Sequence, residues 1–172
     1  MAFTIRPYSS LDWEFVKRIN QEGIETGHAT FDAQPKERSV WENDSYDWSQ
    51  FVAVSDTGEV CGWVCMWPTS DRCCYSGIAE ISIYISKSAR GQGVGKALIN
   101  EAVKASEENG FWTIVAGVFP ENTASVKLHH ACGFRTVGVR EKMGLMAYGP
   151  LKNVWRDNLL LERRSKTVGV GT

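Results

Sequence analysis

Seven residues at positions 90–96 combine backbone flexibility with positive charge in a way that suits phosphate binding. They read Arg90-Gly91-Gln92-Gly93-Val94-Gly95-Lys96, between a strand-like run, "AEISIYI", and a helical pattern. At a helix N-terminus the unpaired N–H groups and the helix dipole favour phosphate oxygens. Glycines let the backbone approach a ligand closely. The segment therefore predicts a loop that binds a diphosphate.

The glycine spacing differs from that of two common nucleotide-binding motifs. A dinucleotide-binding turn needs G-x-G-x-x-G and a P-loop needs G-x-x-x-x-G-K-[ST], whereas the spacing here is G-x-G-x-G. A plain strand-to-helix turn also fits poorly. Such a turn rarely uses three alternating glycines, because each one raises the entropic cost of folding.

The elements around this loop are expected to alternate between strands and helices. Strands are expected at 3–7, 50–55, 59–67, 78–86, 112–119, 135–144 and 154–164. Helices are expected from Ser9 or Ser10 to about Thr26, at 36–43, at 94–109 and within 120–134. This order predicts an α/β (α+β) domain over residues 1–165, with helices packed on a mostly antiparallel sheet. Residues 166–172 are expected to form a flexible tail.

Composition bounds the possible partners. Nineteen basic residues oppose twenty acidic ones among 172 residues, for a net charge of -1, which favours neither nucleic acid nor an anionic membrane. No apolar run reaches the ~20 residues of a membrane span, and no secretory signal is recognisable, so we expect a cytoplasmic protein. The five cysteines fit no common metal pattern, which favours reduced structural thiols and no metal.

The loop resembles the R/Q-x-x-G-x-G/A signature of the GCN5-related N-acetyltransferase (GNAT) superfamily, in which it holds the pyrophosphate of acetyl-coenzyme A. Within that superfamily the chain resembles the phosphinothricin and methionine sulfone or sulfoximine acetyltransferase branch. The matching segments are "GHATFD" (27–32), "RCCY" (72–75), "EISIYI" (80–85), "ENTASVKLHHACGF" (121–134) and "VWRDNLLLER" (154–163). The resemblance covers residues 3 to about 164 and implies the GNAT fold. One departure is Gly77, where the branch often has an aromatic residue, so the pocket is expected to differ in shape.

The resemblance implies direct transfer of an acetyl group from acetyl-coenzyme A to the primary amine of a small amino-acid-like substrate. Two alternatives remain open at this point: acetylation of a protein N-terminus or lysine, and a non-catalytic module that binds acyl-coenzyme A. No cysteine lies in a motif with a base, so an acyl-cysteine route is not indicated.

Two residues are candidates for proton transfer. An amine attacks a thioester only as the free base, and Glu80 begins an apolar strand where partial burial would raise its pKa. The resemblance implies the same role for Glu80, through a water molecule; a strand carboxylate without function is the alternative. His129 matches the family's residue that protonates the departing thiolate, and histidine can serve as acid or base. Its neighbour His130 is expected at the surface.

Further cofactor contacts are implied along the strand and the fourth helix. Backbone groups of the Ile83-Tyr84-Ile85 segment are expected to bond the pantetheine amides as an added strand would. Asn122 is expected to cap the helix, and the resemblance adds a contact with the pantetheine arm. Ser125 matches a position near the cofactor, although helix packing explains it equally well.

For the acceptor, Arg72 can bind a carboxylate bidentately and Tyr75 can close the pocket. A solvated loop cation is an equal reading of Arg72. Thr30 and Phe31 match a segment that lines the substrate site, although Phe31 also suits a core. Branch members are often homodimers, and the apolar segment 145–155 is consistent with either an interface or a core.

Overall fold

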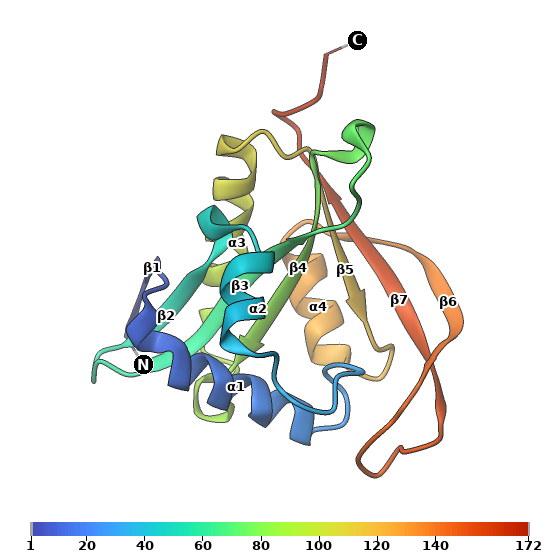
Figure 1. The fold of residues 1–172 in the computed structure, drawn as a ribbon. Helices are drawn as coiled ribbons and strands as arrows, with labels where there is room; N and C mark the ends of the chain where they lie inside the picture. Colours follow the sequence, from blue (N-terminus) through green and yellow to red (C-terminus); the bar gives the residue numbers. More distant parts are fainter. Residues whose placement is uncertain (1, 172) are drawn as a thin grey trace.

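The computed structural model describes residues 2–171 and shows one seven-stranded sheet with helices on both of its faces (Figure 1). The strands are β1 (Phe3–Pro7), β2 (Phe51–Ser55), β3 (Val60–Pro68), β4 (Ile78–Ile85), β5 (Thr113–Val118), β6 (Arg135–Leu145) and β7 (Trp155–Arg164). The helices are α1 (Trp13–Glu25), α2 (Arg38–Asp44), α3 (Val94–Glu108) and α4 (Thr123–Ala131). The order across the sheet is β1-β2-β3-β4-β5-β7-β6. Every pairing is antiparallel except β4 with β5, so the predicted fold class is confirmed.

The element boundaries differ from the expected ones mainly at helix starts. Ser9 caps a single 3-10 turn, Ser10–Asp12, through a capping box with Asp12, and α1 begins only at Trp13. The second helix begins at Arg38 because Glu37 is still extended.

Two apolar layers hold the helices to the sheet. On one face Leu98 and Ile99 of α3 lie at 0% exposure against the strands, and on the other Val16 and Ile19 of α1 are equally buried. Burial of each such side chain contributes ~2 kcal/mol. These layers fix α3, whose N-terminus carries the glycine-rich loop.

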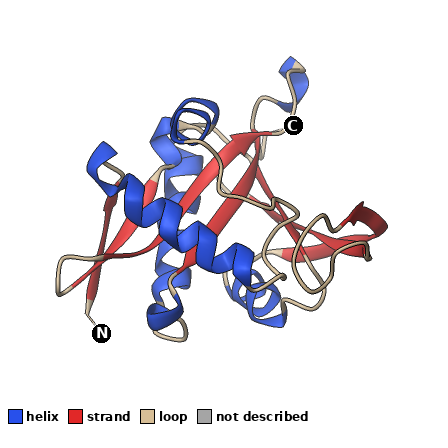
Figure 2. Cartoon of the chain, turned by 60° about the horizontal axis from the view of Figure 1, so that its bottom comes forward, coloured by secondary structure: helices blue, strands red, loops and turns tan. Residues whose placement is uncertain are grey.

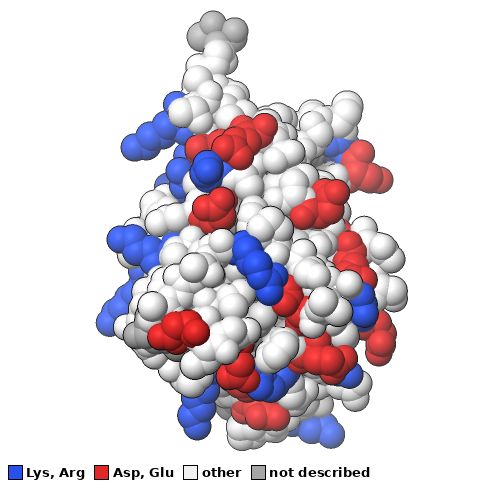
Figure 3. Space-filling view, turned by 90° about the vertical axis from the view of Figure 1, so that its left-hand side faces the viewer, with Lys and Arg blue, Asp and Glu red and all other residues white. Residues whose placement is uncertain are grey.

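The helices leave part of the sheet uncovered. In Figure 1, α1 and α2 lie over the β1–β4 side of the sheet, and Figure 2 shows the β6–β7 end projecting beyond the helices. β6 is the last strand in the order, and nearly all of its residues are exposed. Figure 3 shows a different face, on which basic and acidic side chains are both present.

The chain after β7 folds back on itself. The Arg164 guanidinium donates a 2.8 Å hydrogen bond to the carbonyl of Val168, and the Ser165 hydroxyl accepts one from the Val168 N–H at 3.0 Å. Part of the segment expected as a tail is therefore hydrogen-bonded to the end of β7. Within residues 2–171, none of the helices has the length and apolar character needed to cross a bilayer.

Candidate active site

The site begins where two parallel strands part. β4 pairs with β5 only over Ile78–Glu80 and Thr113–Val115, although β4 continues to Ile85 and β5 to Val118. Beyond Glu80 the two strands diverge, and the resulting gap leads into the interior of the molecule. Glu80 therefore marks the point at which the sheet opens.

The edge of β4 beyond Glu80 offers free backbone groups. The Ser86 N–H bonds to the carbonyl of Cys61, and the register with β3 is regular from there back to Ala79. Because antiparallel pairs alternate, Ser82 and Tyr84 also turn their backbone groups toward β3. Ile83 and Ile85 therefore turn theirs toward the gap, where a ligand could pair with them as an added strand would. The Ile85 carbonyl accepts a 3.3 Å hydrogen bond from Arg90 Nε.

Two of the loop glycines are required by backbone conformation. Gly91 has φ +73° and Gly93, the N-cap of α3, has φ +86°, in the left-handed region that side chains disfavour. A Cβ built on either residue meets no atom within 4 Å, so both face open space. The first N–H groups of α3 point into the same space without intrahelical partners. A diphosphate fits this arrangement because it supplies the missing acceptors and complements the helix dipole.

The third glycine has a different role. A Cβ on Gly95 would lie 2.8 Å from Leu128 of α4. Gly95 therefore allows the first turn of α3 to pack closely against α4, which fixes the width of the cleft between them.

A cavity of about 1130 Å³ joins these features and extends along β4 to the 28–32 segment. Its size suits a large ligand, at the upper end of small-molecule sites. Of the residues predicted from sequence it brings together Thr30, Phe31, Glu80, Ile83, Tyr84, Ile85, Arg90, Gly91, Gly93, Val94, Gly95, Lys96, Asn122, Ser125 and His129. Gln92 does not line the cavity, because its amide turns back to donate a 2.7 Å hydrogen bond to the Ser88 carbonyl.

Glu80 is more open than we expected. The side chain is exposed, so the expectation of partial burial does not hold. The sequence shows an apolar strand but not that its β5 neighbour leaves at Glu80. Since side chains alternate along a strand, Glu80 shares a face with Ser82 and Tyr84, on the α1 side of the sheet. Trp67 donates a 3.0 Å hydrogen bond to the Ser82 hydroxyl beside it.

His129 approaches the gap from the opposite, α3–α4 side of the sheet, and is only 2% exposed. Its Nδ1 lies 2.8 Å from the Ser125 carbonyl, which can only accept, so Nδ1 carries the hydrogen. Nε2 is then unprotonated, and it is buried without a hydrogen-bond partner among residues 2–171. Burial lowers the pKa of His129. The resting histidine is thus neutral and presents an acceptor. His130 is exposed, as predicted.

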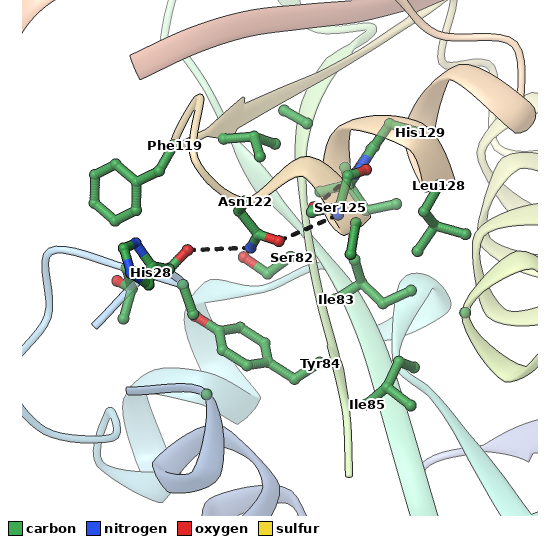
Figure 4. A pocket seen from close by; sticks show the side chains of 18 of the residues that line it. His28, Ser82, Ile83, Tyr84, Ile85, Phe119, Asn122, Ser125, Leu128 and His129 are labelled. Atoms are coloured by element: carbon green, nitrogen blue, oxygen red, sulfur yellow. Dashed lines mark hydrogen bonds between the residues drawn. The ribbon is translucent and has the colours of Figure 1, made fainter. Parts of the chain in front are cut away.

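Asn122 ties the start of α4 to the 28–32 segment. Its side-chain oxygen accepts from the Ser125 N–H at 3.2 Å, which confirms the predicted cap, and its Nδ2 donates to the His28 carbonyl at 3.1 Å (Figure 4). In the same view His28 and Tyr84 lie on one side of β4, and Ile83, Ile85 and His129 on the other.

A buried arginine that the sequence analysis did not single out adds hydrogen bonds between these two segments. Arg156 of β7 is 3% exposed and donates to the Gly27 carbonyl at 3.0 Å and to Glu121 at 3.0 Å. Its guanidinium stacks 4.0 Å from the Phe119 ring centroid. The only sequence signal for this role was its place between Trp155 and Asp157 in the last matching segment.

Thr30, Phe31 and Tyr84 line the cavity near the 28–32 segment. The Thr30 carbonyl accepts a 2.8 Å hydrogen bond from Tyr148, and Phe31 packs edge-on against Phe119 with ring centroids 4.7 Å apart. Phe31 also lies so close to Gly144 of β6 that a Cβ there would approach its ring to 2.7 Å. Burial raises the pKa of Tyr84, so its hydroxyl remains protonated.

Arg72 and Tyr75 lie outside the cavity. Both are exposed on the β3–β4 loop, where the Arg72 guanidinium stacks 5.2 Å from the Tyr75 ring centroid. The structure explains why position 77 is a glycine in this chain. A Cβ on Gly77 would lie 2.1 Å from the Trp112 ring, so Trp112 fills the space that a larger residue at position 77 would need.

Comparison with known proteins agrees with this geometry. Residues 13–134 match the family described as "Acetyltransferase (GNAT) family". The chain belongs to this family. A phosphinothricin N-acetyltransferase of Streptomyces viridochromogenes is 29% identical to this acetyltransferase over 159 residues, which cover 89% of this chain and 82% of the relative.

Two further matches are acetyltransferases with a named substrate. The L-methionine sulfoximine/L-methionine sulfone acetyltransferase of Salmonella typhimurium is 30% identical over 97 residues, covering 55% of this chain and 56% of the relative. A crystal structure of a phosphinothricin acetyltransferase from Sinorhizobium meliloti, in complex with AcCoA, superposes with a TM-score of 0.84 at 26% identity. That match covers 100% of this chain and 93% of the other. GNAT acetyltransferases use acetyl-coenzyme A as their acetyl donor.

The left-handed turn at Gly93 can be tested with a matched pair of glycines. Gly93→Ala and Gly110→Ala both place a side chain at positive φ (+86° and +81°) with no clash, at opposite ends of α3. Each should lower the free energy of unfolding by ~1–2 kcal/mol. Only Gly93→Ala should also weaken acetyl-coenzyme A binding, by about tenfold or more, because the amides aimed at the diphosphate shift. Calorimetric titration and thermal unfolding measure both effects. Equal coenzyme affinity in the two variants would contradict the assigned role of Gly93.

Burial of neutral His129 predicts an acid-sensitive contribution to stability. The folded state holds the pKa of His129 below its ordinary value of 6.5, so the unfolded chain binds more protons as pH falls through that value. The free energy of unfolding of wild type should therefore decrease below about pH 6.5 more steeply than that of His129→Asn. Urea unfolding at pH 7.5, 6.5 and 5.5 measures the slopes. His130→Asn, at the exposed neighbouring ring, is the control and should follow wild type; identical slopes for all three proteins would refute the prediction.

Proposed function

We propose that this protein transfers the acetyl group of acetyl-coenzyme A directly to the primary amine of a small amino-acid-like substrate of the phosphinothricin, methionine sulfone or methionine sulfoximine type. The observation that carries the proposal is the position of Glu80 at the point where β4 leaves β5, with His129 on the other side of the gap. The named activities of the relatives support the substrate class.

The coenzyme is proposed to lie along the gap. The amides of the 90–96 loop and the N-terminus of α3, with Arg90 and Lys96 beside them, would hold the diphosphate. Ile83 and Ile85 would bond the pantetheine amides through their backbone groups, with Tyr84 between them and with Asn122 and Ser125 across the gap. This arrangement would bring the thioester to the apex of the gap, which is the point near Glu80 at which β4 and β5 separate.

The residues at the apex have distinct roles in this proposal. The reaction forms a C–N bond and breaks the C–S bond of the thioester, whose electron pair leaves with sulfur. Glu80 takes the proton of the amine, through a water molecule. One backbone N–H on the free edge of β4 donates to the carbonyl oxygen as it becomes negative. Glu80 returns the amine proton to solvent water, and the neutral His129 takes a proton from solvent at Nε2 and passes it to the thiolate as the C–S bond breaks. The lowered pKa of His129 makes the protonated ring a strong donor.

We further propose that the protein is a homodimer and that β6 lies in the interface. β6 is an edge strand, and such edges are usually covered or blunted in native proteins. Here the edge and the turn after it expose Val137, Val139, Met143, Leu145, Val154 and Trp155 by 44–57% each. A second copy of the chain would bury this surface. The five cysteines are free, which suits a reducing compartment, and we propose the cytoplasm as its location.

Replacement of the proposed base tests the chemistry. Glu80→Gln keeps the size of the side chain but cannot take a proton, so kcat for methionine sulfone should fall by about 10²- to 10⁴-fold. The KM for acetyl-coenzyme A should stay within about twofold, because Glu80 is not proposed to hold the coenzyme. Release of coenzyme A thiol measures both quantities. Glu108→Gln, at the far end of α3, is the control, and full activity in Glu80→Gln would remove Glu80 from the mechanism.

The dimer is tested by a charge on the edge strand. Val139 is 54% exposed in the single chain, so Val139→Glu should leave the fold of one subunit intact and disrupt an interface built on β6. Sedimentation velocity should give a wild-type mass of about twice the 19.2 kDa chain and a single-chain mass for the variant. A monomeric wild type at micromolar concentration would contradict the proposed dimer.

A further inference from the structure

The segment directly after β7, residues 165–169, is hydrogen-bonded to two other parts of the fold, and we call it the C-terminal turn. Ser165 is 5% exposed, and its N–H donates to the Trp112 carbonyl at 2.8 Å. Its hydroxyl donates to Glu107 of α3 at 2.9 Å and accepts from the Val168 N–H at 3.0 Å. The turn therefore connects the end of α3 with the residue that precedes β5. In Figure 1 it lies at the top of the view, where α3 ends and β4 begins.

The guanidinium of Arg164, the last residue of β7, holds this turn in place. It donates to the carbonyls of Trp112 at 2.9 Å and Val168 at 2.8 Å, and also to the carbonyl of Gly169. Hydrogen bonds from an ionised donor are stronger than those between neutral groups. We therefore expect Arg164 to contribute more than any neutral group to the position of the turn.

Gly169 allows the turn to lie directly on Trp112. Its φ is +64°, in the region that side chains disfavour. A Cβ on Gly169 would also lie 3.0 Å from the Trp112 Cβ and 3.0 Å from Nη2 of Arg164. A side chain at this position would therefore push the turn away from Trp112.

Trp112 in turn lies against the residue that precedes β4. The backbone N–H groups of Trp112 and Thr113 both donate to the Gly77 carbonyl, at 2.9 and 3.1 Å. The indole ring fills the space beside Gly77, where a Cβ would approach it to 2.1 Å. Trp112 thus contacts both Gly77 and the C-terminal turn, and it connects them.

This contact lies at the pairing that joins the two halves of the sheet. One half is β1-β2-β3-β4 and the other is β5-β7-β6, and among residues 2–171 they pair only over Ile78–Glu80 with Thr113–Val115. A ladder of so few backbone hydrogen bonds opens easily. The bonds to the Gly77 carbonyl extend it at the end opposite to the gap. The width of the gap beyond Glu80 therefore depends on how firmly Trp112 is held.

We propose that the C-terminal turn positions the two halves of the sheet relative to each other and so sets the width of the gap at Glu80. Arg164 and Gly169 are positioning residues: neither lines the coenzyme cavity, and both act through Trp112 and Gly77. The inference rests on the proposed function in taking Glu80 as the base. Its effect on the β4–β5 pairing can be measured without any reaction.

Two glycines in the same segment provide the test. Gly169→Ala should displace the turn, whereas Gly171→Ala is the matched control, because Gly171 has no positive φ and a Cβ there meets no atom within 4 Å. Amide hydrogen exchange at Trp112 and Thr113, measured without ligand, should become about tenfold faster in Gly169→Ala only. Arg164→Gln should also speed this exchange, and Arg164→Lys should recover part of the protection because it keeps a charged donor.

Kinetics show whether the contact matters for the reaction. The kcat for methionine sulfone should fall by about tenfold in Gly169→Ala and Arg164→Gln, because a small displacement of reacting groups slows the transfer. The KM for acetyl-coenzyme A should stay within about threefold, since the 90–96 loop lies at the opposite end of α3 from Glu107. Assays well below the melting temperature of each variant keep a mere loss of stability from lowering kcat.

The outcomes separate this inference from the proposed function. Unchanged exchange at Trp112 and Thr113 in both Gly169→Ala and Arg164→Gln would overturn the inference, and so would faster exchange with a wild-type kcat. A wild type that acetylates no small amine would instead refute the proposed function. The exchange measurement would then decide by itself whether the turn positions the two halves of the sheet.

Discussion

The parallel pairing of β4 with β5 stops after three residues, and the site depends on that limit. If the two strands stayed paired to their ends, the edge of β4 beyond Glu80 would be saturated and no gap would form in the sheet. Because they part, the backbone groups of Ile83 and Ile85 are left without a strand partner. The same separation leaves Glu80 at the start of the gap, on the wall of the large cavity. One interruption of a hydrogen-bonded ladder thus frees the edge of β4 and places Glu80 where the gap begins.

Packing and polar contacts far from the apex keep this opening in shape. Gly95 lets α3 approach α4, so the helix N-terminus is aimed into the gap, and the apolar layer around Leu98 holds α3 to the sheet. At the other end of the cavity, Asn122 and the buried guanidinium of Arg156 fix the 27–31 segment to the start of α4 and to β7. Leaving such a buried charge unpaired would cost several kcal/mol, so this connection is held firmly. The walls of the cleft are therefore set by contacts that do not themselves touch a reacting atom.

The sequence predicted the strands and helices well because those depend on local patterns. Alternating apolar residues define the strands. The positive φ of Gly91 and Gly93 is a finding of the structure, and it gives a second reason for glycine in the loop. The surroundings of Glu80, Arg72 and Gly77 depend on long-range geometry that no local pattern contains. The apolar strand around Glu80 predicts partial burial, but the departure of β5 leaves this side chain exposed. Arg72 is suitable by residue type, and the structure places it exposed on the β3–β4 loop, outside the lining of the large cavity. The role of Gly77 is clear only from the structure, in which Trp112 fills its space.

The central claim is that the free edge of β4 and the amides at the start of α3 bind acetyl-coenzyme A. Amide hydrogen exchange with and without the coenzyme tests it most directly, because it reports on the backbone groups themselves. We predict slower exchange at Ile83, Ile85 and residues 91–96 when the coenzyme is bound, with unchanged exchange in β1 and β2. Saturating coenzyme that leaves these amides unprotected, or that protects only a different part of the chain, would contradict the account.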